Sequence, residues 1–196
     1  MDIITHSLAG AALARTGFQE PLGAKRATWA AVAASNVADL DIVQVAFQGY
    51  DAYIFDHRGI THSLVGWLFA TALLTGLFRV IWRDVRLGPL ALLIGLAYGG
   101  HILMDVPTSW GTMLWLPFDD ARVALDWVFI VDVVIWAILV LPWFFRKRLG
   151  EILVFRAAFV VLGLYYVFCG VAHGVAEASL ELTLDHQQIP ARIACL

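Results

Sequence analysis

The chain has 196 residues, which suits one domain, and 61% of them are hydrophobic whereas 15% are charged. Soluble globular domains are less apolar and more highly charged, so this composition excludes an ordinary soluble fold and indicates a membrane protein. The formal net charge of −3, with no basic patch among exposed aromatic residues, argues against a stable nucleic-acid partner. Two cysteines are too few for a disulfide framework or a thiolate metal site.

The first apolar segment, residues 3–16, is alanine-rich and predicts a helix too short to cross a bilayer. It carries the heptapeptide ITHSLAG at 4–10, which returns as ITHSLVG at 60–66. Six of the seven positions match, so the repeat predicts two equivalent helix entrances, one carrying His6 and the other His62. The similarity ends soon after each copy, which leaves both a true duplication and two independent helix starts open.

A second short apolar segment, 27–43, predicts another helix that ends on Asp39-Leu-Asp41. Carboxylates at this end oppose the helix dipole, and a bound cation would remove the conflict. Residues two apart point in different directions, so only one of them is expected to bind a metal. Asp39 is the candidate ligand and Asp41 a candidate proton acceptor. A solvated helix end would explain either aspartate taken alone.

The polar connection 44–59 is expected to leave the membrane, and it leads through the sequence HRGITHS into the apolar run 61–82. His57 in the loop and His62 in the first helical turn are candidate ligands that reach one ion from different backbone elements. Arg58 is placed to receive an anionic group such as phosphate. Helix capping beside merely interfacial histidines is the alternative interpretation.

The next apolar run, 88–105, ends on HILMD, in which His101 and Asp105 are four residues apart. This spacing puts the imidazole and the carboxylate on one helical face, where both can chelate one metal ion. A neutral, hydrogen-bonded polar pair inside a bundle is the alternative. Ionisable side chains within membrane spans are costly and mark functional sites, which favours the metal hypothesis.

The connection 106–123 holds two prolines, a glycine and two tryptophans, and predicts an ordered interfacial loop. Two further apolar runs, 124–145 and 152–176, predict the last spans. The first of these runs contains Asp126, interpreted as a helix-start residue, and Asp132, which lies deeper and is a second candidate proton acceptor.

The last predicted span carries a second pair with four-residue spacing, His173 and Glu177. His173 is a weaker candidate metal ligand, and Glu177 is equally well explained as a solvated carboxylate.

The sequence therefore predicts an all-α, polytopic membrane bundle of about six helices, four of them clear spans and two shorter and N-terminal. Residues 1–176 form one membrane-embedded domain, and 177–196 form a polar C-terminal tail. Lys and Arg collect at cytoplasmic helix ends. Nine of the 13 basic residues lie in the turns after the first, third and fifth helices: Arg15, Lys25, Arg26, Arg79, Arg83, Arg86, Arg146, Lys147 and Arg148. The candidate ligands gather at the other end, which is therefore expected to face away from the cytoplasm.

Imidazoles and carboxylates without thiolates suit zinc, with manganese or another first-row divalent ion as alternatives. The candidates outnumber the ligands of one tetrahedral ion, so two or more ions about 3.5–4 Å apart are also consistent with the sequence. The full set of candidate ligands is His6, Asp39, His57, His62, His101, Asp105 and His173.

Three motifs, MDIITHSLAGAALARTG, HRGITHSL and HILMDVPTSWGTMLWLPF, closely resemble the LexA-regulated, membrane-bound metal-dependent hydrolase family of bacterial inner membranes. The resemblance covers 1–135 and implies a multi-pass inner-membrane hydrolase without naming its substrate. The chain is also distantly similar to zinc-dependent phospholipase C and related single-strand nucleases. In those soluble enzymes an early His, an Asp, a later His and an HxxxD pair follow one another, as do His6, Asp39, His57 and HILMD here, and HGVAE at 173–177 matches a further pair.

The leading functional hypothesis is hydrolysis of a small-molecule or lipid phosphoester by metal-activated water, with Asp41 or Asp132 accepting the proton. Membrane lipids are the expected partners. A cation or proton transporter would use the same residues as a relay, but a relay should extend through the bilayer, whereas these residues crowd at one end. The third hypothesis is a purely structural metal ion that holds the helices together.

Overall fold

The computed structural model describes residues 1–44, 47, 49, 51 and 57–186. The regular elements of this part of the chain are all helices, with no strand, which confirms the all-α prediction. Its seven α-helices and two 3₁₀ turns are α1 (Ile3–Ala14), α2 (Gln19–Leu22), α3 (Ala24–Val37), η1 (Ala38–Gln44), η2 (Ile60–His62), α6 (Leu64–Ile81), α7 (Leu87–Asp105), α8 (Val133–Leu149) and α9 (Glu151–His186).

Three helices are long and apolar enough to cross a membrane: α6, α7 and the Glu151–Leu184 part of α9. The short apolar helix α1 does not reach that length, as its sequence predicts. The third predicted span, 124–145, is wrong in its position, because α8 begins only at Val133 and ends at Leu149.

The late start of α8 has a local cause. Residues before it are paired with the preceding loop, since the amide of Leu125 donates to Val106 O (3.1 Å) and that of Trp127 to Pro107 O (2.9 Å). Asp126 has a left-handed backbone (φ 57°), so its interpretation as a helix-start residue is wrong. That position belongs to Asp132, whose carboxylate caps the first amides of α8.

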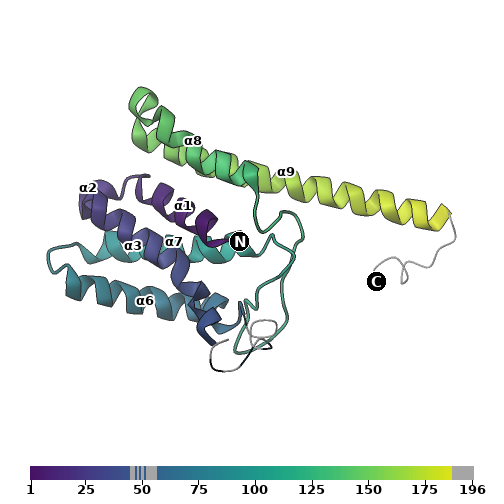
Figure 1. Ribbon diagram of the computed structural model, residues 1–196, viewed down its shortest axis with the longest axis horizontal. Coiled ribbons are helices and arrows are strands. Elements are labelled where there is room, and N and C mark those ends of the chain that lie inside the picture. The colour runs from purple at the N-terminus through teal and green to yellow at the C-terminus, as the bar shows by residue number, and fades with distance from the viewer. Residues whose placement is uncertain (45–46, 48, 50, 52–56, 187–196) are drawn as a thin grey trace.

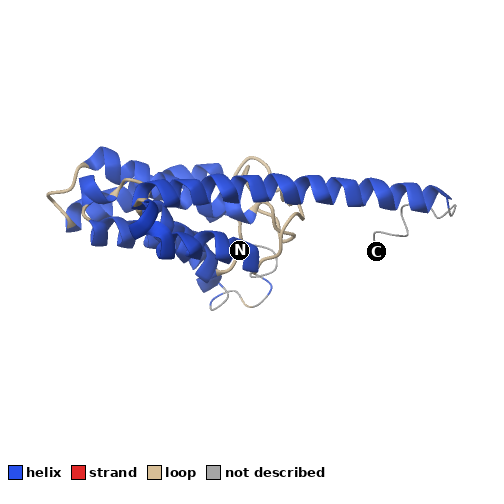
Figure 2. Ribbon diagram, turned by 90° about the horizontal axis from the view of Figure 1, so that it is seen from above, coloured by secondary structure: helices blue, strands red, loops and turns tan. Residues whose placement is uncertain are grey.

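Helix α9 runs well beyond the predicted span 152–176 (Figures 1 and 2). Its 36 residues correspond to about 54 Å, more than a hydrocarbon core of about 30 Å requires. Residues 177–186 of the predicted polar tail are therefore helical, and 187–196 lie outside the described residues.

Helices α1, α3, α7 and α6 pack side by side, and the hairpin of α8 and α9 lies next to α1 (Figure 1). The face of α3 in this bundle consists of Ala27, Ala30, Ala31 and Ala34, all fully buried. Small side chains let neighbouring helix backbones approach closely, which is how membrane helices gain packing energy. The alanine-rich sequence of α3 thus places it at the centre of the bundle.

Gly10 of α1 lies at the tightest point of the contact with α3. A Cβ there would stand 2.6 Å from Ser35 Oγ and 2.8 Å from the carbonyl oxygen of Ala31. We expect Gly10→Ala to lower the free energy of unfolding by about 1–3 kcal/mol, because the two backbones must move apart. Thermal denaturation in detergent measures the effect. Gly76→Ala on α6 is the control, since a Cβ at Gly76 meets nothing within 4 Å, and equal losses in the two variants would contradict the prediction.

The helices alternate in direction, which sorts their ends into two groups. The start of α1 and the ends of α3 and α7 lie at one end of the bundle, whereas the turns after α1, α6 and α8 lie at the other (Figure 1). The second group contains the nine basic residues discussed above. Candidate ligands and basic turns are therefore at opposite ends, as the charge pattern predicts.

Candidate metal centre

Four buried or half-buried side chains converge at the ligand-bearing end of the bundle: Asp39 from η1, His62 from η2, and His101 and Asp105 from α7. One ligand atom from each lies within 4.8 Å of all the others. The Nε2 atoms of His62 and His101 are each 3.5 Å from Asp39 Oδ1 and 3.3 Å from Asp105 Oδ2. Two imidazoles and two carboxylates in this arrangement form a donor set that suits a tetrahedral divalent ion.

His101 is oriented by the backbone of α3. Its Nδ1 lies 2.7 Å from the carbonyl oxygen of Ser35, an acceptor, so Nδ1 carries the proton and Nε2 keeps its lone pair. That Nε2 faces the Nε2 of His62 at 2.9 Å. Two imidazoles on one tetrahedral zinc ion stand about 3.3 Å apart at zinc–nitrogen distances of about 2.0–2.1 Å. The observed separation is therefore close to that of two ligands sharing an ion.

His62 is oriented in the same way by Asp41 and Thr61. The Thr61 hydroxyl donates to Asp41 Oδ2 (3.1 Å) and so accepts from His62 Nδ1 (3.0 Å). Asp41 Oδ2 is itself 3.7 Å from His62 Nδ1. Carboxylates and hydroxyls on the far nitrogen of a metal-binding histidine select its tautomer and increase its basicity. Asp41 thus acts on the candidate ligand rather than as a ligand, which agrees with the choice of Asp39 from the sequence.

The two oxygens of Asp105 face different partners. Oδ1 contacts the amino group of Met1 and lies 3.1 Å from Nη2 of Arg58 and 3.4 Å from Nε2 of His6. Oδ2 is buried, faces the two Nε2 atoms, and has no hydrogen-bond partner among the described residues. Leaving a buried carboxylate oxygen without a donor costs free energy, and a cation between the four donors would satisfy it.

The surroundings of the centre favour ionised carboxylates and a neutral His62 imidazole. Burial raises the pKa of Asp39, but its contacts with His62 and with the imidazole of His101 outweigh burial and lower the pKa to about 2. Burial also opposes ionisation of Asp41, whose contacts with His57 and the amide of Arg58 nevertheless lower its pKa below the ordinary value. Desolvation lowers the pKa of His62. At neutral pH the carboxylates are therefore charged and this imidazole is neutral, as metal ligation requires.

His6 lies beside the four-residue group without belonging to it. Its ring stacks on that of His101 at 3.7 Å, and it is fully buried. Neither of its nitrogens has a hydrogen-bond partner in the part of the chain that the structure describes. His6 is thus available to a ligand at the edge of the centre, although the structure does not place it among the four converging donors.

The repeated ITHSL segments bring both histidines to His101 through different local structures. The first copy lies inside α1, which is capped by Asp2, so that His6 is in the first helical turn. In the second copy His62 ends a 3₁₀ turn, and Ser63 caps α6. The prediction of two equivalent helix entrances is therefore wrong, because Asp2 precedes the first copy and captures the cap position that Ser63 takes in the second.

His57 lies outside the four-residue group. Its Nδ1 is 2.8 Å from Asp41 Oδ1, and its ring centre is 5.9 Å from that of His62. His57 thus contacts the centre through Asp41, not through the donor atoms that surround the candidate metal position.

Arg58, interpreted from the sequence as an anion-binding residue, contacts protein groups among the described residues. Its side chain is 4% exposed, with Nη2 at Asp105 and Nη1 donating to Thr108 Oγ1 (2.9 Å). Its backbone is left-handed (φ 61°), an unfavourable conformation for a long side chain. This strain is compensated by the ion pair, so the geometry assigns Arg58 to charge compensation of Asp105.

Two further candidates are not brought to the centre. The carboxylate of Asp132 is used by the amides of Val134 and Ile135 and by the hydroxyl of Tyr165. His173 pairs with Glu177 at 3.1 Å on the exposed part of α9. Four-residue spacing makes such a pair on any helix surface, and only tertiary contacts separate it from the pair in α7.

Several contacts of the candidate metal centre have no signal in the sequence. Nothing in the local sequence distinguishes three of the groups involved: the carbonyl oxygen of Ser35 and the hydroxyls of Thr61 and Thr108. Their importance comes from their positions next to His101, His62 and Arg58, which follow from the packing of α3, η2 and the loop after α7.

Comparison with known proteins identifies the family of this chain. The YdjM inner membrane protein family matches residues 1–176. The chain belongs to this family. An uncharacterized protein of Bacillus subtilis (strain 168), YfhP, is 27% identical over an alignment of 180 residues that covers 87% of this chain and 52% of YfhP. The chain thus spans about half the length of this relative. No solved structure matches this chain.

Membership supports an inner-membrane location, in agreement with the three candidate spans. The matched region includes all four converging residues of the candidate metal centre, Asp39, His62, His101 and Asp105.

Proposed function

We propose that this YdjM-family chain is a membrane-bound, metal-dependent hydrolase that cleaves a phosphoester with water activated at the candidate metal centre. The observation that carries the proposal is the convergence of two oriented imidazoles and two carboxylates around one point, with Asp105 Oδ2 unsatisfied. Asp39, His62, His101 and Asp105 would hold the ion, and zinc suits this donor set best. A divalent ion bound there would supply Lewis acidity and would lower the pKa of a bound water to about 7.

The remaining residues have separable tasks in this proposal. Asp39 is the most accessible ligand, with 24% of its side chain exposed, so water and substrate approach from its side. Asp41 is a weak base, since its pKa is lowered and it already accepts from His57, Arg58 and Thr61. We therefore assign proton transfer to His57, which Asp41 holds in place, as in other histidine–carboxylate pairs.

The location of the centre follows the charge distribution. The basic turns lie at the end of the bundle opposite to the centre, and such turns face the cytoplasm in multi-pass proteins (Figure 1). The proposal therefore includes catalysis at the non-cytoplasmic face of a bacterial inner membrane.

The test combines metal analysis with turnover in the purified full chain. We expect stoichiometric metal and hydrolysis of at least one of three probes: p-nitrophenyl phosphate, bis(p-nitrophenyl) phosphate and a short-chain phosphatidylcholine. Chelation should abolish hydrolysis, and zinc or manganese should restore it. His57→Gln should retain the metal but lose about 10²–10⁴-fold in turnover, because it removes a general base and no ligand.

Two outcomes would exclude this function. Retained metal with no turnover of any probe, together with unfolding on chelation, would show a structural metal. Metal-dependent ion flux in proteoliposomes without hydrolysis would show a transporter.

A further inference from the structure

A crevice leads from the candidate metal centre along the membrane-embedded part of the protein. It has a volume of about 430 Å³ and lies between α1, α3, α7 and α9. His6 and His101 form one end of its wall, and the rest is largely apolar, including Met104, Leu162 and Phe159. The crevice therefore joins the polar centre to an apolar surface that faces the lipid.

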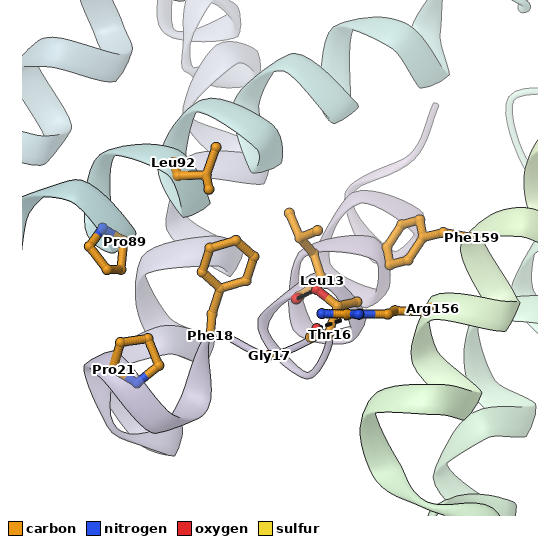
Figure 3. Close-up of a pocket in the computed structure, with 9 residues that line it drawn as sticks. All are labelled: Leu13, Thr16, Gly17, Phe18, Pro21, Pro89, Leu92, Arg156 and Phe159. Carbon is orange, nitrogen blue, oxygen red and sulfur yellow. Dashed lines mark hydrogen bonds between the residues drawn. The ribbon is translucent and has the colours of Figure 1, made fainter.

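A second cavity, of about 540 Å³, continues the crevice towards the basic end of the bundle. The two cavities share Leu13 and Phe159, and Leu92 of the second lies one helical turn from Leu96 of the first. Figure 3 shows Leu13 opposite Phe159, which comes from α9, with Arg156 beside them. The two cavities are adjacent and lie in one line between α9 and the rest of the bundle, which is called the path below.

The path has the length of one membrane leaflet. From His101 to Leu92 it follows nine residues of α7, or about 14 Å. This is close to half of a hydrocarbon core of about 30 Å. A hydrocarbon chain whose polar head lies at the metal centre would end near Leu92.

Glycines on two facing helices create the space. A Cβ added at Gly100 of α7 or at Gly163 of α9 would meet no atom within 4 Å. Both positions line the crevice. Any larger residue at either position would therefore project into the path instead of clashing with the protein.

We propose that this crevice holds a hydrocarbon chain of the substrate, which is then a membrane lipid with a phosphoester head at the metal centre. The assignment rests on the proposed hydrolase function for the chemistry at the head, whereas the binding of the chain depends on the crevice alone. Apolar walls, an opening to the bilayer and a leaflet's length match an acyl chain. A water-soluble phosphoester would use none of these features.

The test uses Gly163→Leu, which fills the crevice without touching a candidate ligand. The full chain is reconstituted in phosphatidylethanolamine–phosphatidylglycerol vesicles that contain a phosphatidylglycerol with a diazirine in its acyl chain. We expect photolabelling of peptides from α7 and α9, and about tenfold less labelling in Gly163→Leu. Gly174→Leu is the matched control, since it lies on the same helix, outside the crevice, and its Cβ also meets nothing within 4 Å.

A second measurement separates the crevice from the hydrolase. Gly163→Leu should bind metal normally and hydrolyse bis(p-nitrophenyl) phosphate at the original rate, but it should cleave a long-chain phospholipid about tenfold more slowly. Equal labelling of Gly163→Leu and Gly174→Leu would overturn the lipid assignment even if hydrolysis is found. Selective loss of labelling without any hydrolysis would keep the chain site and reject the hydrolase. A change of oligomeric state in Gly163→Leu alone would show that the crevice receives a helix of a second copy instead.

Discussion

Replacing His101 with alanine is expected to abolish stoichiometric metal binding and, with it, any metal-dependent turnover. His101 supplies one of four converging donor atoms and is held in position by Ser35. Loss of an outer-shell partner alone costs about 10–100-fold in affinity, so loss of a ligand should cost more than about 100-fold. Elemental analysis of the purified protein and isothermal titration with zinc measure the effect.

His173→Ala is the matched control for this experiment, because His173 also has a carboxylate four residues away but lies outside the centre on α9. It should bind metal like the original chain. Equal metal content in both variants would show that the four residues are not the binding site, and loss in both would assign His173 to it. Circular dichroism of the metal-free proteins distinguishes loss of a ligand from loss of the fold.

Arg58→Gln is expected to lower the free energy of unfolding of the metal-free protein by about 3–5 kcal/mol. The guanidinium is buried against Asp105, and removal of one partner leaves an uncompensated charge in the interior. Metal should reverse much of the loss, since an ion bound at Oδ2 compensates the same carboxylate. Thermal denaturation with and without zinc measures both effects.

Two further variants test the cause of that loss. Asp105→Asn in the Arg58→Gln background should restore stability of the metal-free protein, because it removes the uncompensated charge. Arg26→Ala is the control. It breaks an ion pair with Asp84 that is shorter, 2.6 Å against 3.1 Å, but lies at the surface, where the carboxylate is 71% exposed. It should leave stability unchanged. Failure of Asp105→Asn to restore stability would show that Arg58 acts through packing or backbone strain.

The relative positions of residues within one helix were predicted more accurately than contacts between residues of different elements. Four-residue spacing was enough to place His101 and Asp105 on one face of α7, and the opposed directions of residues two apart limited the expected ligand to one of Asp39 and Asp41. The same spacing argument also selected His173, which the structure leaves on the exposed part of α9. Spacing describes one helix surface and does not tell which surface faces a site.

The roles of Asp41 and Arg58 show the same limit. Both were expected to act on substrate or water, and both instead contact candidate ligands, Asp41 beside His62 and Arg58 against Asp105. The distinction depends on where the loop before α6 meets η1 and α7. No local pattern encodes these contacts, because the two residues of each pair are 17 to 47 positions apart in the sequence.

The sequence by itself determined the class of the fold, three of the four predicted long spans, and the enrichment of one bundle end in His and Asp. These properties depend on composition and on order along the chain, since the transfer of apolar residues into lipid is a nearly local free energy. Only the tertiary structure decided which histidines converge, where α8 begins and where the crevice lies. Those outcomes depend on groups that are distant in the sequence. Asp132 takes the cap of α8 while the preceding residues pair with the loop after α7, and Gly100 and Gly163 line the same crevice from two different helices.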